Sequence, residues 1–422
     1  MHPAPSPAID LAEIIQRESV VTHFQPLITM RSQSILGVEA LARGLDPDSG
    51  QLIPPGQLFD LATSDHLLID LDRLCRKKAL QEFRTLRDQS PGLVLSLNFE
   101  AGLLDRGVVG SGVLLRQVRE AGLDPAEVII EIVESRVADT SALESFVQRH
   151  RSHGFLVGLD DLGAGHSNLE RVALIQPDVL KIDRSLISGL DRHYHKQEVT
   201  RSLLNLAGKI GALVVAEGVE HEEEALLALE LGVDILQGFY LAYPRAAREP
   251  LDLCHHRIRQ LAASYRGYTV RKIAAKKAQH QVYGEVVQVL VQNLSGCARQ
   301  ELDQRLVELM TVHPALECLY VLDENGTQVS ETVCEAKKLN RNRRGIFWPA
   351  ARGQDQSLKN YYLLLKAGLE KYTSEAYISL ATGNLCITIS TWFPGATGSR
   401  FVLCADFDAD PGLEAAFEPE TA

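Results

Sequence analysis

Short apolar segments alternate with amphipathic helical segments from about Val20 to Pro244, and this alternation constrains the fold more than any other feature. The segments that look like strands are VTHFQPLITM, SILGVEALAR, LVLSLNF, VIIEIVES, FLVGLDD, VLKID, ALVVAEGV and ILQGF. Helical stretches such as LIDLDRLCRKKALQEFRTLRD and ALESFVQRHRSHG lie between them. Buried strands that alternate with helices predict an α/β fold with a parallel sheet. A stretch of this length suits a closed (β/α)8 barrel of roughly eight units.

A doubly wound open sheet is the alternative, because periodicity does not show whether a sheet closes. No GxGxxG or GxxxxGKS loop follows the first predicted strand, and this disfavours the nucleotide-binding form of the open sheet.

The pattern changes after Pro244. Residues 251–296 have a long helical pattern with many charges and few helix breakers, which predicts one or two connector helices. Two roles stay open for this segment: a dimerisation element, or simple packing against the barrel.

From about Glu301 the segments are typical of an α+β domain. The helical stretch ELDQRLVELMTVH precedes the strand LECLYVLD, an Asn-Gly turn and the segment QVSETV. A second helical stretch, QSLKNYYLLLKAGLEKY, leads to the strands EAYISLATG, NLCITISTWF and SRFVLCADF. We therefore divide the chain into a barrel domain (1–250), a helical connector (251–299) and an α+β domain (300–422).

Composition indicates a soluble globular protein. Hydrophobic residues make up 45% of the 422 residues and charged residues 23%. No apolar run approaches the roughly 20 residues of a membrane span, and the N-terminus lacks a secretory pattern, so we expect a cytoplasmic protein. Seven scattered cysteines without a CxxC pair favour reduced thiols over structural zinc or a disulfide framework. The net charge of −12 disfavours binding of a nucleic acid polymer.

Polar residues stand where the predicted strands end. They are Glu39, Asn98, Glu131, Asp160, Asp161, Lys181, Glu217 and Gln237. In a parallel barrel these ends all lie on the face where active sites are built. We therefore expect the side chains of Glu39, Asn98, Glu131, Asp160 and Asp161 to converge on one mouth.

Oxygen donors dominate this set, and its carboxylates cannot gather as bare anions without repulsion and loss of hydration. Divalent cations are the simplest compensation. An oxygen-rich set without His or Cys favours Mg²⁺ or Mn²⁺ over zinc. The adjacent Asp160 and Asp161 suit a two-metal site for an in-line displacement at phosphate. The alternative for each acid is a helix N-cap or an ion pair, but every strand would then need its own reason for a polar end.

The strings around these residues resemble the EAL domain family. FQPL and VEALAR resemble the start of the domain, and LSLNFE, EIVES, LDDLGAGHSNL, LKIDRSLI, VVAEGVE and QGFYLAYP follow in the family's order over roughly residues 20–245. The resemblance implies a TIM-like barrel with one strand outside the regular parallel arrangement. It also implies hydrolysis of the bacterial second messenger cyclic di-GMP to linear pGpG.

The resemblance implies a role for each site residue. Glu39, Asn98, Glu131 and Asp160 match the ligands of a first Mg²⁺ or Mn²⁺ ion, and Asp160 and Asp161 match those of a second. Lys181 matches the lysine that holds and activates the attacking water, Glu217 the acid that supports the second metal's water, and Glu134 the acid that steadies the loop after Asp161. Among the substrate-binding positions, Arg43 matches the arginine on a phosphate, Gln237 the amide near the phosphate and water, and Asp183 the partner just beyond Lys181.

Two positions depart from the family's pattern. The loop after the aspartate pair reads LGAGHSN at residues 162–168 instead of FGTGYSS or FGAGYSS, and Glu100 replaces a small polar residue. No metal ligand is missing, which favours a phosphodiesterase over the alternative, an inactive receptor that binds cyclic di-GMP and signals to a partner. The resemblance and the long helix also imply a homodimer.

Residues 300–410 resemble PAS/Cache-like sensory domains in the strings KNYYLLLKAG, EAYISLATG and CITIS. This resemblance implies a regulatory module with a possible small-molecule ligand. Candidates for a small-anion pocket are Arg343, Arg344, Trp348, Tyr361 and Tyr362. The alternative is that these residues are surface charges and core aromatics. Cys386 and Cys404 lie in predicted strands, where buried inert thiols are expected.

Overall fold

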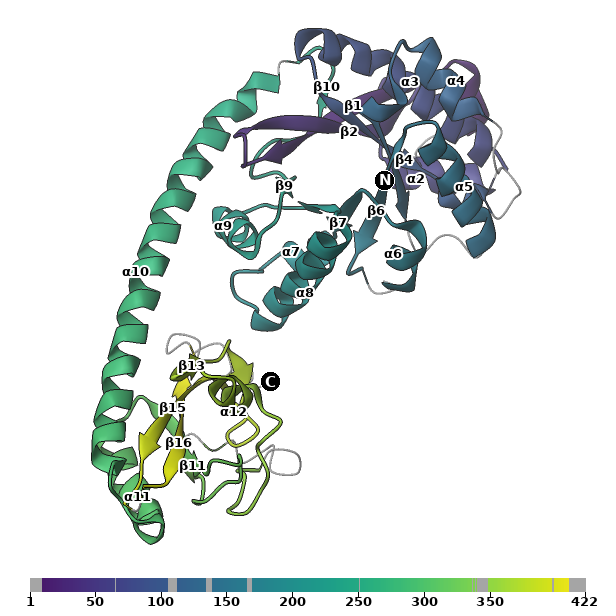
Figure 1. Ribbon diagram of the computed structural model, residues 1–422. Helices are drawn as coiled ribbons and strands as arrows, with labels where there is room; N and C mark the ends of the chain where they lie inside the picture. The colour runs from purple at the N-terminus through teal and green to yellow at the C-terminus, as the bar shows by residue number, and fades with distance from the viewer. Residues whose placement is uncertain are drawn as a thin grey trace, which may run out of the picture. The chain divides into compact units, whose positions relative to one another are not determined.

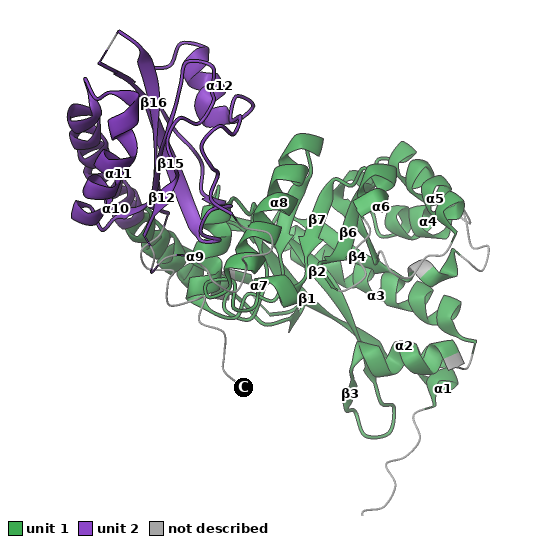
Figure 2. Cartoon of the chain, turned by 90° about the horizontal axis from the view of Figure 1, so that it is seen from below, with its two compact units in different colours: residues 1–269 green, residues 270–422 purple. Residues whose placement is uncertain are grey.

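The computed structural model divides into two compact units, residues 1–269 and 270–422 (Figures 1 and 2). It describes residues 10–64, 66–104, 112–133, 139–164, 169–249, 251–335, 337, 339, 348–396 and 398–409. Glu134, Arg343, Arg344 and residues 165–168 of the divergent loop lie outside the described residues.

The first unit is built on one ten-stranded sheet, most of which closes into a ring. Its strands are β1 (Val20–Thr29), β2 (Ser34–Leu45), β3 (Leu52–Ile53), β4 (Val94–Phe99), β5 (Val128–Val133), β6 (Leu156–Leu162), β7 (Val179–Ile182), β8 (Leu213–Ala216), β9 (Ile235–Leu236) and β10 (Arg245–Ala246). The order β1-β9-β8-β7-β6-β5-β4-β2 is closed into a ring by pairing of β2 with β1. Two short strands lie outside the ring: β3 pairs with β2, and β10 pairs with β1. The predicted barrel is therefore confirmed, and the open-sheet alternative is excluded.

Strand β1 is the one ring strand that departs from the parallel arrangement. It pairs antiparallel with both β2 and β9. The remaining ring pairs, from β2–β4 round to β8–β9, are parallel. The carboxyl ends of β2 and β4 to β9 therefore meet at one mouth.

Helices cover the outside of the ring. They are α1 (Leu11–Gln16), α2 (Pro55–Ser64), α3 (Leu68–Gln89), α4 (Val113–Glu120), α5 (Thr140–Ser152), α6 (Leu169–Ile175), α7 (Arg184–Ile187), α8 (Tyr194–Ile210) and α9 (Glu222–Leu231). Short 3-10 helices of this unit lie at Ala101–Leu103, Pro125–Glu127 and Leu251–Cys254, and another, Arg299–Glu301, belongs to the second unit. The large apolar core lies between these helices and the strands, as in Phe83 of α3 against Phe24 of β1.

Inside the ring, an apolar layer supports a polar one. Leu27, Ile129, Val179, Val215 and Ile235 form a separate buried cluster contributed by strands alone. Successive strand residues point to opposite faces, so the residues two positions further along share the same face. At four of these strands that residue is polar: Glu131, Lys181, Glu217 and Gln237. Apolar side chains therefore fill the barrel below its mouth, and polar side chains lie at the mouth.

The second unit contains a six-stranded antiparallel sheet in the order β12-β11-β16-β15-β13, with β14 paired to β15. The strands are β11 (Leu316–Leu322), β12 (Val333–Cys334), β13 (Lys371–Thr373), β14 (Tyr377–Ile378), β15 (Leu385–Pro394) and β16 (Arg400–Asp408). The helices are α10 (His255–Leu294), which crosses the boundary between the units, α11 (Leu302–Val312) and α12 (Asn360–Lys366). The predicted additional sheet domain is present, while its PAS/Cache-like character stays a prediction.

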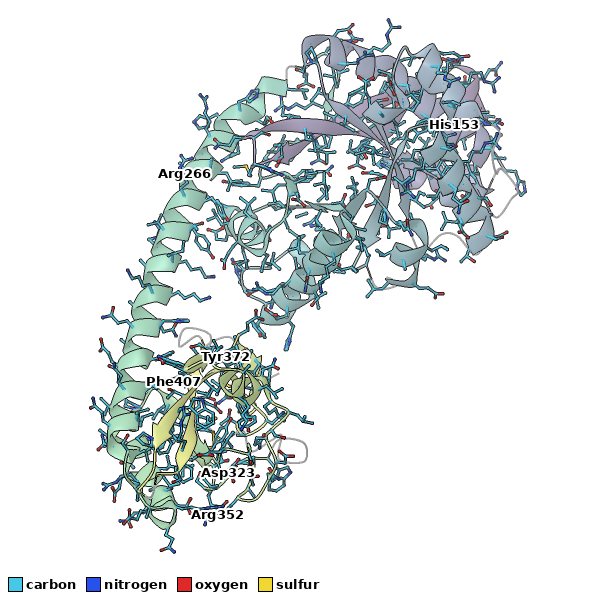
Figure 3. The ribbon with its side chains drawn as sticks, in the orientation of Figure 1. His153, Arg266, Asp323, Arg352, Tyr372 and Phe407 are labelled. Carbon is cyan, nitrogen blue, oxygen red and sulfur yellow. A yellow bond between two sulfur atoms is a disulfide. The ribbon has the colours of Figure 1, made fainter. Side chains whose placement is uncertain are left out.

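The two faces of this sheet are different. One face packs against α10 and α11. Phe407, labelled in Figure 3, belongs to this face, and its ring stacks on that of Tyr283 with ring centroids 4.4 Å apart. The other face carries Tyr320, Val402 and Cys404 toward Tyr362 of α12. Within the segment QVSETV, Gln328 forms an isolated bridge with Leu322, and Val333 begins the short strand Val333–Cys334.

A disulfide joins Cys318 to Cys334. The prediction that the cysteines are reduced thiols is therefore wrong for this pair. Antiparallel pairing of β11 with β12 places the two residues directly opposite each other, with Cα atoms 4.1 Å apart. The two cysteines are 16 residues apart in the sequence, and this spacing alone did not predict a disulfide. Cys386 and Cys404 are buried free thiols, as predicted.

Among the described residues, no helix combines the length and the apolar character that a bilayer crossing requires.

Candidate active site

Lys181 lies at the centre of the barrel mouth, with its side chain 1% exposed. Its Nζ atom is 2.6 Å from Glu217 Oε1, 2.9 Å from Glu131 Oε1, 3.4 Å from Glu39 Oε2 and 3.6 Å from Asp160 Oδ1. One ammonium group thus faces four carboxylates that come from β2, β5, β6 and the end of β8. The structure brings together the acids that the sequence placed at strand ends.

Strand register explains this convergence. Asn98 of β4 lies opposite Glu131 of β5, and Val133 of β5 lies opposite Asp160 of β6. Glu131 and Val133 are two residues apart on β5 and share a face, so Asn98, Glu131 and Asp160 all point to the same side of the sheet. Glu217 and Gln237 stand just beyond β8 and β9, where each strand gives way to a loop.

Two amide side chains hold the carboxylate of Glu39. Asn98 Nδ2 donates to its Oε1 at 2.8 Å, and Gln237 Nε2 donates to its Oε2 at 2.6 Å. Gln25 accepts a second hydrogen bond from Gln237 Nε2 at 3.2 Å and donates to the carbonyl of Ala242 at 3.1 Å. Gln25 lies opposite Glu39 in the β1–β2 pairing and was missed at the sequence level. Its only signal was a polar residue within the apolar string FQPL.

The electrostatics of the cluster are dominated by burial and by the excess of acids. Burial disfavours the charge of Lys181, but the surrounding carboxylates, Asp160 and Glu131 first, hold its pKa well above the usual value. Burial raises the pKa of Glu131 well above its usual value against the opposing effect of Lys181. Burial likewise raises the pKa of Glu217 to about 8. One ammonium does not compensate three buried acids and the partly buried Glu217, and Glu131 Oε2 has no hydrogen-bond partner among the described residues.

The donors that remain suit divalent cations. Ligand atoms of Asp160, Asp161 and Glu217 all lie within 4.8 Å of one another. Asp161 has φ 59°, a left-handed conformation that is uncommon for an aspartate and that its surroundings must maintain. Its N–H donates to Asp160 Oδ1 at 2.9 Å, which fixes the adjacent carboxylate. The donor set is all oxygen, so its chemistry fits Mg²⁺ or Mn²⁺.

Two predicted substrate-binding residues lie outside this network. Arg43 is a half-buried residue of β2 whose Nη1 donates to the carbonyl of Ala42 at 2.8 Å. Asp183 is the N-cap of α7 and accepts from the N–H of Ser185 at 2.8 Å. Among the described residues, neither forms a hydrogen bond or ion pair with the carboxylate cluster, and their roles toward a substrate stay predictions. The role of Glu134 stays a prediction as well.

A cavity of about 320 Å³ adjoins the cluster. Glu39 and Asn98 lie in its wall, together with Glu100, one of the departures noted in the sequence. The remaining lining residues are Thr22, Ala40, Leu41, Ala42, Pro55, Gly56, Phe59, Asp72, Cys75, Arg76, Ala79, Leu97, Phe99 and Val133. The carboxylate cluster therefore opens on one side into a space large enough for part of a ligand.

Asp72 and Arg76 are the charged residues of this cavity that sequence reasoning missed. They form a buried ion pair on α3, and the Arg76 guanidinium lies 5.2 Å from the centroid of the Phe99 ring. Burial raises the pKa of Asp72 against the effect of Arg76. The signal was in the periodicity: the two residues are four apart, on the helix face that also buries Leu68, Cys75 and Ala79. A charged pair on an otherwise apolar helix face indicates either a buried salt bridge or side chains that line a cavity.

Comparison with known proteins identifies the first unit. The family model described as "EAL domain" matches residues 9–244. "Bifunctional diguanylate cyclase/cyclic di-GMP phosphodiesterase MucR" of Pseudomonas aeruginosa is 32% identical over 250 residues, which are 57% of this chain and 35% of MucR. "Cyclic di-GMP phosphodiesterase PdeR" of Escherichia coli is 28% identical over 240 residues, 56% of this chain and 36% of PdeR. The chain thus spans about a third of the length of these relatives.

One relative matches both units. "Uncharacterized EAL-domain containing protein YkuI" of Bacillus subtilis is 25% identical over 388 residues, which are 88% of this chain and 91% of YkuI. The crystal structure of YkuI in complex with "substrate c-di-GMP and calcium" superposes with a TM-score of 0.77 at 24% identity, over 96% of this chain and 100% of that one. This structural likeness shows the fold alone. A c-di-GMP complex of the MucR phosphodiesterase has a TM-score of 0.51 at 28% identity and covers 56% of this chain and 96% of that one.

Proposed function

The chain belongs to the EAL domain family, and from this premise we propose that it hydrolyses cyclic di-GMP to linear pGpG with the help of Mg²⁺ or Mn²⁺. The observation that carries the proposal is the buried Lys181 among the carboxylates of Glu39, Glu131, Asp160 and Glu217 at the carboxyl ends of the barrel strands. MucR, PdeR and the YkuI complex are named for the same messenger, which supports the choice of substrate.

The metal ions would be held by the oxygen donors of the mouth. Glu39, Asn98, Glu131 and Asp160 are assigned to one ion, and Asp160 and Asp161 to the second. The excess of buried acid over the single Lys181 supports this assignment, because cations would relieve it. When bound, such ions withdraw electron density from phosphate oxygens and so favour attack at phosphorus.

Lys181 and Glu217 are assigned to the attacking water. A lysine ammonium has three N–H donors and no acceptor, so Lys181 orients the water by donating to its oxygen. Glu217, whose Oε1 lies 2.6 Å from Lys181 Nζ, is assigned to support the water of the second ion. Gln237 is assigned to the substrate phosphate and the water, and its Nε2 also donates to Glu39 Oε2 at 2.6 Å. Arg43 is assigned to a substrate phosphate, since a guanidinium fork binds two oxygens at once.

Three further parts of the proposal concern the whole chain. We propose that it acts in the cytoplasm as a homodimer and that the second unit regulates turnover. Sedimentation of the full chain at several concentrations tests the dimer, and a single monomeric species throughout would exclude it.

Hydrolysis of cyclic di-GMP by the purified full chain tests the activity. We expect pGpG to form with Mg²⁺ or Mn²⁺ and not with a chelator, and Glu39→Ala to abolish it. The matched control is Glu198→Ala, which removes an exposed acid of α8 that pairs with Arg201. Product from Glu39→Ala at the normal rate would mean that the site is wrong. Binding of cyclic di-GMP without any product would make the chain a receptor.

A further inference from the structure

A second cavity, of about 570 Å³, lies in the second unit on the face of the sheet that carries Tyr320 and Cys404. Its size falls within the range of small-molecule sites in proteins. The cavity is lined by Tyr320, Thr332, Trp348, Pro349, Ala350, Gln354, Asp355, Gln356, Lys359, Tyr361, Tyr377, Ser379, Leu380, Ala381 and Asp406. None of these residues belongs to the site proposed for hydrolysis.

Asp406 is the group that gives this cavity its chemistry. It is only 3% exposed and comes from the central strand β16. Thr388 Oγ1 donates to its Oδ1 at 2.7 Å, and the Tyr377 hydroxyl lies 2.6 Å from Thr388 Oγ1. Because Thr388 has one hydroxyl proton and gives it to the carboxylate, Tyr377 must be the donor to Thr388. The chain of hydroxyl groups therefore runs toward Asp406 and ends there.

In the part of the chain that the structure describes, only one of the two carboxylate oxygens of Asp406, Oδ1, accepts a side-chain hydrogen bond. Among the described residues, no side chain besides Thr388 forms a hydrogen bond or ion pair with this carboxylate. A second acid, Glu317 of β11, is also buried and raises the pKa of Asp406 further after the larger effect of burial. A buried carboxylate that accepts only one hydrogen bond lacks the compensation that its charge needs, and a cation bound in the adjoining cavity would supply it.

Aromatic rings form much of the remaining lining. Tyr320, Tyr361 and Tyr377 contribute phenol rings, and the Tyr361 hydroxyl is fixed by a hydrogen bond of 3.1 Å to Gln356 Oε1. Aromatic faces attract organic cations and contact the hydrocarbon attached to them. A bare metal ion fits less well, because the described residues of this unit contain no group of three acidic, His or Cys ligands within reach of one ion.

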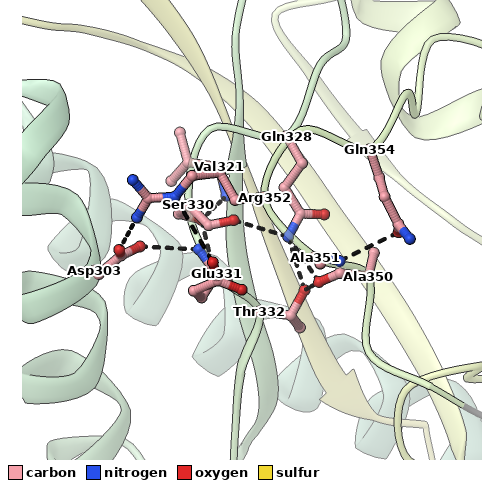
Figure 4. A network of polar contacts seen from close by, with 10 residues as sticks. All are labelled: Asp303, Val321, Gln328, Ser330, Glu331, Thr332, Ala350, Ala351, Arg352 and Gln354. Carbon is pink, nitrogen blue, oxygen red and sulfur yellow. Dashed lines mark hydrogen bonds and ion pairs between the residues drawn. The ribbon is translucent and has the colours of Figure 1, made fainter.

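The wall formed by residues 348–356 is held from two sides (Figure 4). Gln328 Nε2 and Thr332 Oγ1 both donate to the carbonyl of Ala350, at 3.0 and 2.6 Å. Arg352 pairs with Asp303 at the start of α11, and Asp303 also accepts from the N–H of Glu331 at 2.9 Å. The cavity is thus bounded by a segment with fixed attachments rather than by a free loop.

We propose that this cavity binds a small organic ammonium ion, with its charged nitrogen on Asp406 and its hydrocarbon body against Tyr320, Tyr361 and Tyr377. The small-anion pocket considered from the sequence is disfavoured, because an anion would meet the buried carboxylate of Asp406, whereas the cation of the lining, Lys359, is exposed. Of its candidate residues, Trp348 and Tyr361 line the cavity, whereas Tyr362 donates to the carbonyl of Glu324 instead. The proposal is independent of hydrolysis in the first unit.

Titration of the full chain with matched pairs of amines and alcohols tests the proposal. The probes are phenethylamine, tyramine and 1,4-diaminobutane, each beside the alcohol with hydroxyl groups in place of amino groups. Both tryptophans of the chain, Trp348 and Trp392, lie in the second unit, so tryptophan emission reports on binding there. We expect at least one amine to bind, and to bind at least tenfold more tightly than its alcohol.

Variants separate the carboxylate from the cavity. Asp406→Asn should abolish the preference for the amine, and the matched control Glu370→Gln, which removes an exposed acid of the same unit, should retain it. Ala381→Phe should block binding without a change of charge. The proposal is overturned if no amine of the panel binds, if amines and alcohols bind equally, or if Asp406→Asn keeps the preference.

Discussion

Lys181 Nζ lies 2.6 Å from Glu217 Oε1, and these two residues are presented by neighbouring parallel strands of the barrel, β7 and β8. The same nitrogen lies within 3.6 Å of three further carboxylates. Lys181 therefore holds the mouth together as well as serving the proposed reaction, and its removal should affect stability and activity separately.

Lys181→Met should destabilise the protein in the presence of a chelator by about 3 kcal/mol, because it leaves buried acids without their cation. Added Mg²⁺ should recover more of the melting temperature in this variant than in the parent, since it supplies the missing positive charge. Thermal unfolding with and without Mg²⁺ measures both effects. Lys77→Met is the control, because Lys77 forms an exposed pair with Glu18 and should cost less than about 1 kcal/mol. Equal losses in the two variants would contradict the argument.

Asp72→Asn should cost about 3 kcal/mol, because it leaves the buried Arg76 guanidinium without its anionic partner. Asp70→Asn is the matched control on the same helix. Asp70 is exposed in the first turn of α3, and its loss should cost less than about 1 kcal/mol. Chemical denaturation of both variants gives the comparison, and a difference below the error of the two midpoints would show that the buried pair contributes little.

Asp406→Asn should stabilise the second unit in a pH-dependent way. Burial raises the pKa of Asp406 to about 7, whereas the unfolded chain ionises near 3.8. Between these values the folded state binds more protons, so the contribution of Asp406 to stability falls as pH rises from about 4 to about 7 and is constant above. The variant should therefore match the parent near pH 4 and exceed it by about 2 to 4 kcal/mol near pH 8.

The groups that face Asp406 do not obscure this effect. Burial raises the pKa values of Tyr320, Tyr361, Tyr377 and Cys386, so these groups stay neutral through pH 8. Glu317 of β11 is present in parent and variant alike, as are Asp355 and Lys359 of the cavity wall. Unfolding of the full chain at several pH values, followed by tryptophan emission, gives the measurement. A constant difference between variant and parent would contradict the assignment to Asp406.

Reduction of the Cys318–Cys334 disulfide should destabilise the second unit by about 3 kcal/mol, the loop entropy expected for a bond that spans 16 residues. Melting of the parent with and without a phosphine reductant measures the loss. Cys334→Ser should melt at the lower temperature under both conditions. If the reductant opens the disulfide and the melting temperature of the parent does not change, the bond does not contribute to stability.

Much of the first unit was predictable from two rules, one on the faces of a strand and one on the ends of parallel strands. Residues two apart on a strand share a face, and parallel strands of a barrel end at one mouth, so Glu39, Glu131, Asp160 and Lys181 were expected together. Gln25 was not expected, because it lies within β1, whose antiparallel course brings the middle of the strand opposite Glu39. The pattern of strand ends does not apply to a strand that runs the other way.

The second unit was less predictable because its site depends on register. In the sequence, Asp406 is a single acid within an apolar predicted strand. Only the pairing of β16 with β15 brings it opposite Thr388. The same holds for Cys318 and Cys334, which meet through the register of β11 and β12. Antiparallel strands joined by long loops leave such register open in a single sequence.

The antiparallel closure by β1 has a consequence for biosynthesis. Gln237 and Glu39, whose side chains are hydrogen-bonded, are 198 residues apart in the chain, and β1 can pair with β9 only after β9 has left the ribosome. Contacts of such high sequence separation slow folding. The edge of β1 that pairs with β9 therefore stays open until nearly the whole barrel has been translated. Any chain that terminates before Gln237 would lack one of the two amide hydrogen bonds that hold the carboxylate of Glu39.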